Sequence, residues 1–316
     1  MSLRQAGWSL VIAASFLTGC ATGTLQYEQL SAEPAVTGLT DQVLLHEIPF
    51  FPQEAYQCGP ASLAMLMSHQ GKSVQPSELV DQVFIESRQG SLKAEMLAAT
   101  RRQGLLPYVH DTRFSTLLEQ LDAGHPVLVF QNLGFGFYPV WHYAVVIGYD
   151  LNEETMVLHS GTTAGLERDF KRFELEWRGG DYWAMTMHRP GKFPRNAEPT
   201  PYLEATAGLE QAGQFEAAAL AYQAATERWP DQLIAWMGLG NVRYRQQQFE
   251  DAQHAYQQAL TLNVDSAAAH HNLAWALMRQ QDFDAAYEPA RTANRLADEQ
   301  GDRYRSALHA WLENQK

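Results

Sequence analysis

Residues 57–66 read QCGPASLAML, and this short run decides how the first half of the chain is interpreted. Pro60 is preorganised for the first turn of a helix, and the residues from Ala61 to Ser68 are mostly good helix formers. The pattern predicts a helix that begins at or just after Cys58. At a helix N-terminus, unpaired N–H groups and the helix dipole favour the thiolate, which is the nucleophilic form of cysteine. The alternative is a small buried hydrophobe at a helix start.

A histidine suited to serve such a thiol opens a second informative run, HYAVVIGY, residues 142–149. The apolar pattern after His142 predicts a buried central strand, whose opening polar residue is held at the rim of the sheet. A histidine there can take the thiol proton and return it to a leaving amine. The preceding stretch 134–139, GFGFYP, is expected to form a flexible wall of a substrate cleft. Five other histidines are expected on the solvated surface: His46, His69, His110, His125 and His188.

Together, Gln53, the run 58–65 and the run 142–149 resemble the bacteriocin-processing (double-glycine leader) cysteine peptidases and their stand-alone relatives. The resemblance covers residues 44–188 and implies an α+β, papain-like domain. It implies that Cys58 attacks an amide carbonyl and that His142 shuttles the proton. It also implies an oxyanion held by the Cys58 backbone N–H and an upstream glutamine side chain. Gln53 is the best match for that glutamine, with Gln57 as the alternative.

The third catalytic position is where this sequence departs from the family it resembles. Relatives place an aspartate or asparagine at the end of the strand that follows the histidine. Here that region reads MVLHSGT, residues 156–162, without a carboxylate. We expect His159 or Ser160 to orient the His142 ring through a weaker hydrogen bond, or Asp150 to reach it from elsewhere. Loss of an orienting carboxylate would lower activity without removing the nucleophile.

The N-terminus has the features of a targeting segment. Arg4 supplies a positive charge, residues 8–17 are mostly apolar, and residues 17–20 read LTGC. This order resembles the lipobox of bacterial lipoproteins, and a run of this length is too short to span a bilayer. We therefore predict a signal peptide over 1–19, lipidation at Cys20 and a polar tether over 20–43. Ala21 after the cysteine points to a Gram-negative outer-membrane lipoprotein facing the periplasm; the alternative is a secretory peptide cleaved near Ala21.

Composition limits the classes of function. The chain of 316 residues is 46% hydrophobic and 19% charged, which suits packed domains, and 316 residues is enough for two of them. Its net charge of −13 argues against a nucleic-acid surface. It has no phosphate-binding glycine loop or metal-ligand spacing, so no cofactor or metal is expected. With Cys20 lipidated, Cys58 is the remaining thiol.

The second half of the chain repeats with a period of 34 residues, which joins Tyr202, Trp236 and His270. The same spacing joins three further sets of residues: Phe215, Phe249 and Phe283; Ala218, Ala252 and Ala286; Ala225, Ala259 and Ala293. This pattern resembles three tetratricopeptide repeats, an all-α solenoid over 199–316 that ends in a capping helix over 302–314. The proline-rich stretch 189–201 is the expected linker. Pro289 predicts a kink in the third repeat.

Three functional hypotheses follow. The first is a lipid-anchored cysteine peptidase that cleaves a peptide or protein amide bond, with repeats that recruit substrate or a protein partner. The second is a non-catalytic adaptor in which the papain-like domain only binds peptides. The third is a thiol acyltransferase, which shares the same Cys58 thioester. Retention of Cys58 and His142 favours an enzyme, and the missing carboxylate favours the adaptor. Membrane contact is expected through the lipid anchor only.

Overall fold

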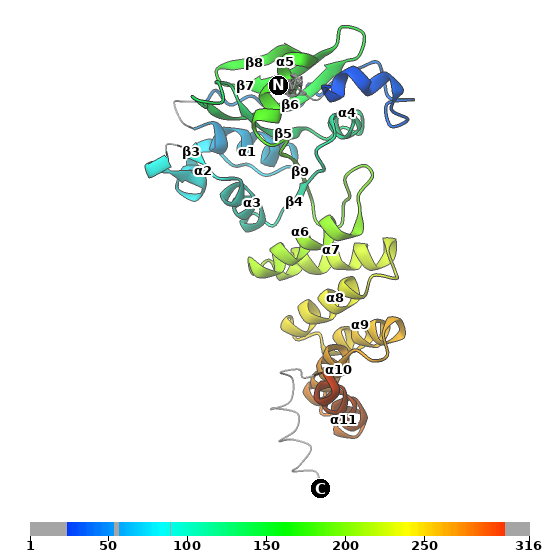
Figure 1. Cartoon of the computed structure of the whole chain (residues 1–316). Helices are drawn as coiled ribbons and strands as arrows, with labels where there is room; N and C mark the ends of the chain where they lie inside the picture. The colour runs from blue at the N-terminus through cyan, green and yellow to red at the C-terminus, as the bar shows by residue number, and fades with distance from the viewer. Residues whose placement is uncertain (1–23, 54–56, 89, 301–316) are drawn as a thin grey trace, which may run out of the picture.

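The computed structural model describes residues 24–53, 57–88 and 90–300. Its first part is an α+β domain around an antiparallel sheet of order β4-β9-β5-β6-β7-β8, with β1 added beside β6 (Figure 1). The strands of this sheet are β1 Gln42–Leu44, β4 Leu106–Val109, β5 Val127–Asn132, β6 Trp141–Asp150, β7 Thr155–Ser160, β8 Thr163–Asp169 and β9 Ala184–His188. A small hairpin of β2 Phe84–Ile85 and β3 Gly90–Ser91 lies apart from it.

Helices cover both faces of the sheet, and the central strand β6 supplies side chains to each. Tyr143 and Val145 join one apolar cluster, whereas Ala144 and Val146 join the other, as alternation along a strand requires. The predicted buried strand is thereby confirmed. The first cluster includes residues of α1 Cys58–His69, α2 Pro76–Val83 and α3 Lys93–Arg102; the second includes residues of α4 Phe114–Asp122 and α5 Phe170–Gly179.

The helix predicted after the QCGP run is α1, and it begins at Cys58 itself. Its first turn is pressed against the β3–α3 region. A Cβ at Gly59 would lie 2.3 Å from Ser91 Oγ and 3.2 Å from Met96 Sδ, so this position requires glycine. The glycine after the cysteine therefore sets how closely the helix start approaches its neighbours. That approach fixes the position of the Cys58 side chain.

The described part of the predicted tether packs on the domain, which corrects the expectation for residues 20–43. Leu25, Leu30 and Leu39 are buried. A 3-10 helix, η1 Gln26–Ala32, presents its backbone to Glu174, whose carboxylate accepts N–H bonds from Gln26 at 2.8 Å and Tyr27 at 2.9 Å. The apolar residues scattered in this polar stretch supply the burial energy that a free tether lacks. The predicted signal peptide and Cys20 lie outside the described residues.

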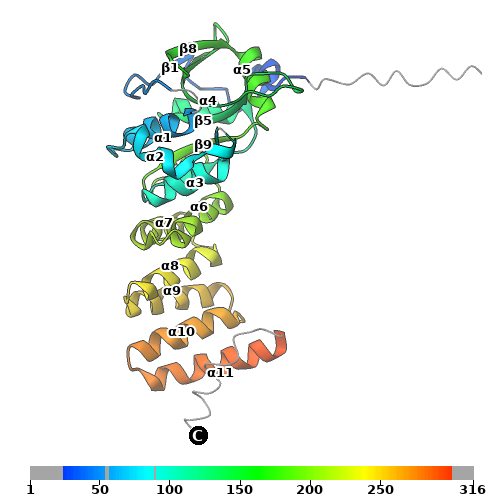
Figure 2. The ribbon, with the colours of Figure 1, turned by 90° about the vertical axis from the view of Figure 1, so that its left-hand side faces the viewer.

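The repeats form three helix pairs stacked below the first domain (Figure 2). Their helices are α6 Pro199–Gln211, α7 Phe215–Arg228, α8 Leu233–Arg245, α9 Phe249–Leu262, α10 Ala267–Arg279 and α11 Phe283–Gln300. Small residues allow the close crossings: a Cβ at Gly238 would lie 2.3 Å from the Tyr222 ring. Helix α11 continues through Pro289. The predicted capping helix over 302–314 lies outside the described residues.

The two parts of the molecule share a joint. Leu106 and Tyr108 of β4 belong to the same apolar cluster as Tyr202 and Leu209 of α6. The linker is bonded to α4 through Arg195. The Gln120 side-chain amide donates to the Arg195 carbonyl at 2.9 Å and accepts from the Arg195 N–H at 3.2 Å. The linker is thus packed, and the repeats extend from the first domain in a defined direction. Within the described ranges no helix is both long and apolar enough to cross a membrane.

Candidate active site

Cys58 and His142 line one cleft of about 790 Å³ between α1 and the start of β6. Cys58 is the first residue of its helix and His142 the second residue of its strand, so both stand at the ends of rigid elements. The backbone N–H of Tyr143, the residue after His142, interacts with the Cys58 thiol and lowers its pKa. The structure thereby brings the helix-start thiol to the histidine end of β6. The other described lining residues are Gln53, Gly90, Ser91, Leu92, Phe130, Tyr138, Pro139, Val140, Trp141, Tyr143 and Gly161.

Burial outweighs the helix start in setting the protonation of the thiol. Desolvation raises the pKa of Cys58, and the backbone N–H groups of Tyr143, Gly59 and Cys58 oppose that rise only in part. The sequence had suggested that the helix N-terminus would favour the thiolate. The helix-start N–H groups do act in that direction, but burial has the larger effect because the neutral thiol is cheaper to bury than its anion.

His142 is held by Ser160. Its Nε2 lies 2.9 Å from Ser160 Oγ at the end of β7. With the proton on Nε2, the ring donates to Ser160 and its Nδ1 is left to act as a base toward the thiol. Burial lowers the pKa of His142 to about 4, so the ring is neutral at physiological pH. The resting pair is therefore a neutral thiol and a neutral imidazole.

Of the three candidates for the third position, only Ser160 reaches His142. His159 points to the other side of β7: its Nε2 lies 3.2 Å from the Ile48 carbonyl, and its Nδ1 accepts the Gly165 N–H at 3.1 Å. Adjacent strand residues face opposite sides, so His159 and Ser160 cannot both serve the ring. The Asp150 carboxylate instead accepts the backbone N–H groups of the turn that follows β6.

Gln53 lines the cleft, whereas Gln57 occupies the N-cap position of α1, without a side-chain capping bond, and is not among the lining residues. The Gln53 Oε1 accepts the Gly161 N–H at 3.1 Å, which fixes the orientation of its amide. Among the described residues, its Nε2 makes only long contacts, 3.3 Å to Ser62 Oγ and 3.4 Å to the Tyr143 carbonyl. Bonds of that length are weak, so this donor is available to a better acceptor.

Sequence reasoning missed the residues that hold Gln53 in place. Ser62 lies on α1 within the motif already quoted, and its Oγ donates to the Tyr143 carbonyl at 3.4 Å. Gly161 follows Ser160 directly, so the end of β7 and the turn after it hold the side chains of both Gln53 and His142. A polar residue in an otherwise apolar helix face was the available signal for Ser62.

Four of the five histidines expected on the surface are wholly or partly buried; His46 is exposed. His188 and His110 both bond Thr186 Oγ1, at 2.7 and 2.8 Å, and the His125 ring meets His188 edge to face. Burial lowers the pKa of His110 to about 3, so its neutral form adds stability above pH 6.5 that is lost as the pH falls toward 3. No group of three or more His, Cys, Asp or Glu in the described ranges is arranged to hold a metal ion.

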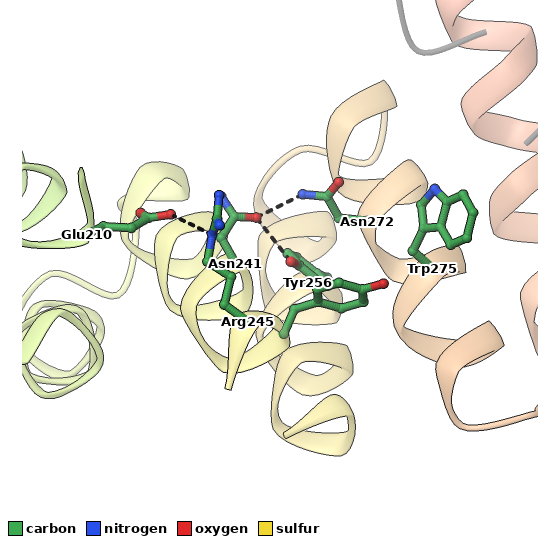
Figure 3. A pocket seen from close by; sticks show the side chains of 7 residues that line it. Glu210, Asn241, Arg245, Tyr256, Asn272 and Trp275 are labelled. Carbon is green, nitrogen blue, oxygen red and sulfur yellow. Dashed lines mark hydrogen bonds and ion pairs between the residues drawn. The ribbon is translucent and has the colours of Figure 1, made fainter. Parts of the chain in front are cut away.

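A second cavity, of about 590 Å³, lies on the repeats and is lined from α6, α8, α9 and α10 (Figure 3). The Asn241 Oδ1 accepts bonds from Tyr256 OH at 3.0 Å and Asn272 Nδ2 at 2.9 Å. This pairing leaves Asn241 Nδ2 as a donor and Asn272 Oδ1 as an acceptor. The remaining lining residues are Glu210, Tyr244, Arg245 and Trp275. We call this cavity the repeat groove.

No curated protein matches the chain. Among solved structures, the type III secretion translocator chaperone SycD of Yersinia enterocolitica is 17% identical, with a TM-score of 0.36, over 38% of this chain and 86% of that one. MamA MSR-1 is 16% identical, with a TM-score of 0.31, over 33% of this chain and 59% of that one. YrrB, described as a TPR protein with an unusual peptide-binding site, is 21% identical, with a TM-score of 0.31, over 32% and 52%.

Family models divide the chain where its architecture changes. Residues 45–184 match the model of the Peptidase_C39 like family. Residues 208–248 and 238–301 match the tetratricopeptide repeat model. The predicted order of an α+β domain followed by an all-α solenoid is confirmed. The chain is therefore a fusion of a Peptidase_C39-like domain with tetratricopeptide repeats.

Proposed function

We propose that the first domain is a cysteine peptidase that cleaves a peptide or protein amide bond through a thioester at Cys58. The observation that carries this proposal is the shared cleft, which is lined by both the helix-start thiol of Cys58 and the strand-start imidazole of His142, with the imidazole Nε2 held by Ser160. A thiol, a base and a group that orients the base are the minimum set for nucleophilic catalysis. The Peptidase_C39-like match supports the same reading.

The neutral pair defines the order of proton transfers. As Cys58 Sγ bonds to the carbonyl carbon, its proton passes to His142 Nδ1 and the carbonyl electron pair moves to oxygen. Collapse of this intermediate expels the amine, which takes the proton from His142 and leaves a thioester. Water then attacks the thioester with His142 as base, which releases the carboxylic acid and restores the thiol. An amine in place of water would make the same domain an acyltransferase.

Gln53 and the Cys58 backbone N–H would hold the oxyanion. The Gly161 N–H already fixes the orientation of the Gln53 amide. The oxyanion can replace the two long contacts of the Gln53 Nε2. A hydrogen bond to an anion is stronger than one to a neutral acceptor, so the exchange favours the transition state.

A thiol-directed peptidyl probe tests this function in the purified mature protein. We expect the wild type to be labelled, Cys58→Ala to be unlabelled, and His142→Ala to be labelled far more slowly because the thiol has lost its base. Equal labelling of the wild type and His142→Ala would identify only an exposed thiol and support the adaptor hypothesis. Adding a primary amine to the turnover assay separates hydrolysis from acyl transfer by the product formed.

For the repeats, we propose that the repeat groove recruits an extended segment of the substrate or of a protein partner. The unused donor of Asn241 and the unused acceptor of Asn272 complement the C=O and N–H of one peptide unit. Tyr244 and Trp275 add apolar surface for side chains. Recognition of backbone groups suits an extended chain, whose peptide units are free of internal hydrogen bonds.

Peptides selected on the wild-type repeats from a displayed library of short unstructured sequences test the groove. The double variant Asn241→Ala/Asn272→Ala is expected to bind them about tenfold more weakly, since two hydrogen bonds are lost. Gln257→Ala, an exposed amide on α9 outside the groove, is the matched control and should bind as the wild type does. Unchanged affinity in the double variant would place the binding surface elsewhere.

The order of charged, apolar and LTGC segments supports the further proposal that Cys20 is lipidated and anchors the protein in the outer membrane, facing the periplasm. Incorporation of labelled palmitate that is lost in Cys20→Ser tests the anchor. Fractionation of inner and outer membranes tests the location.

A further inference from the structure

The connection between β5 and β6 exposes an unusual amount of apolar surface. We call residues 133–141 the aromatic hairpin. Phe137 is 89% exposed, Tyr138 72% and Phe135 71%. Leu133, Val140 and Trp141 are also exposed, so six large apolar side chains gather on nine consecutive residues. Surface of this kind marks a binding site more often than a free surface.

The aromatic hairpin is braced by its own sequence. The Asn132 Oδ1 accepts N–H bonds from both arms, from Gly134 at 3.0 Å and from Val140 at 2.9 Å. Phe135 and Tyr138 exchange backbone hydrogen bonds of 3.1 and 3.0 Å across the turn. A Cβ at Gly134 would lie 2.3 Å from the Tyr138 carbonyl, so the glycine is required for this shape. The predicted flexible wall is therefore a hydrogen-bonded turn that presents its rings in a set orientation.

The exposed rings continue into the cleft. At the tip, the rings of Phe135 and Phe137 lie parallel, 5.7 Å apart. At the base, Trp141 stacks on Phe130 at 5.3 Å, and Phe130 contacts Tyr143, whose backbone N–H faces the Cys58 thiol. Four residues of the aromatic hairpin also line the cleft: Tyr138, Pro139, Val140 and Trp141. A molecule that covers Tyr138 and Trp141 therefore also contacts the wall of the cleft.

The same region offers no formal charge to a ligand. None of the described residues that line the cleft is an acid, a lysine or an arginine. The nearby Lys93 ammonium lies 5.0 Å above the Phe130 ring but is paired with Asp181 at 3.3 Å and donates to the Gly180 carbonyl. Charged side chains in a ligand would lose water here without gaining a partner. The surface is complementary to uncharged, apolar groups.

We propose that the aromatic hairpin selects the substrate, and that it binds polypeptide segments with large apolar side chains beside the scissile bond. The inference rests on the proposed peptidase function and names its substrate class. Apolar side chains on the substrate would cover Phe135 and Phe137 at the tip and reach Trp141 at the cleft wall. Their burial supplies the binding energy that places the amide bond against Cys58.

Binding to Cys58→Ala, which cannot turn over a substrate, tests the proposal by fluorescence anisotropy. The probes are a peptide rich in Leu and Phe and its counterpart in which those residues are Ser. We expect the apolar peptide to bind at least about tenfold more tightly, and Phe135→Ser/Phe137→Ser in the same background to remove most of that preference. Both phenylalanines are highly exposed, so the fold should be unaffected. Leu175→Ser, an exposed apolar residue on α5 outside the cleft, is the matched control and should keep the preference.

Equal affinity for the two peptides, or a preference that survives Phe135→Ser/Phe137→Ser, would overturn the proposal. So would a result in which these substitutions abolish binding to phosphatidylcholine–phosphatidylglycerol vesicles and leave peptide binding unchanged, because the aromatic hairpin would then serve a membrane. Turnover by the wild type is measured separately on the same apolar peptide. A hairpin-dependent preference without turnover would contradict the peptidase function and leave the binding proposal standing.

Discussion

His142→Ala is expected to lower kcat/KM for peptide cleavage by at least about 10³-fold, because the thiol loses both its proton acceptor and the donor to the leaving amine. The effect should be large here because burial raises the pKa of Cys58. A thiol that is protonated at rest depends on its base more than a preformed thiolate does. Steady-state kinetics on a fluorogenic peptide measure the loss, and Cys58→Ala sets the background.

The pH profile of the wild type reports the same pair. The pKa of His142 is lowered to about 4, so the ring accepts a proton only above that value. The kcat/KM should therefore fall as the pH drops through about 4 and be nearly level from there to neutral pH. Protonation of the buried histidines near Thr186 lowers the stability of the fold over the same acidic range. Far-UV circular dichroism must therefore accompany the profile to show that the protein is still folded.

Ser160→Ala supplies the graded comparison. It removes one neutral hydrogen bond from the ring, so we expect a loss of about tenfold in kcat/KM, with Ser160→Thr close to the wild type. If Ser160→Ala and His142→Ala were equally impaired, Ser160 would have a larger role than orienting the ring. If His142→Ala retained most of its activity, the proposed base would be wrong.

Tyr202→Ala is expected to destabilise the molecule by about 3–5 kcal/mol, the range for large aromatic truncations in a core. Tyr202 is fully buried, with its ring 4.4 Å from Phe193 and 5.6 Å from Trp229. It also shares an apolar cluster with Leu106 of β4, so its loss weakens the joint between the two domains. Urea unfolding followed by circular dichroism gives the free energy of unfolding, and hydrogen exchange locates the loss.

Two tyrosine variants control this experiment. Tyr202→Phe keeps the ring contacts and should change stability by less than about 1 kcal/mol. Tyr287→Ala removes an exposed tyrosine of α11 and should also have a small effect. A Tyr202→Ala protein as stable as the wild type would show that the first repeat docks through other contacts. Hydrogen exchange confined to α6 and α7 would show that the joint with β4 tolerates the cavity.

Much of the candidate site could be predicted from short stretches of sequence. Pro60 and the helix-forming residues after it predicted a helix start near Cys58, and the apolar run after His142 predicted a strand that opens with that histidine. Each inference needed only a few consecutive residues. The pairing of Ser160 with His142 could be narrowed to a few candidates but not decided. The choice between Ser160 and His159 depends on which of them points to the same face of the sheet as the His142 ring, and a one-residue change of register would reverse it.

The burial of several residues could not be predicted from their neighbours in the sequence. The described segment after the predicted lipobox looked like a tether because its apolar residues are sparse, yet Leu25, Leu30 and Leu39 all find the domain core. His188 looked like a surface residue because nothing beside it in the sequence is distinctive. The groups that bury it, Thr186 aside, come from other elements.

The family resemblance implied the α+β fold of the first domain. The sequence by itself determined a helix start at Cys58, a buried strand that opens with His142 and helix pairs at a period of 34 residues. These features follow from side-chain periodicity and backbone preference, which act between near neighbours. Only the tertiary structure decided the protonation of Cys58, the partner of His142 and the continuity of the aromatic hairpin with the cleft. Desolvation and contacts between distant segments govern those properties, and both arise when the chain has folded.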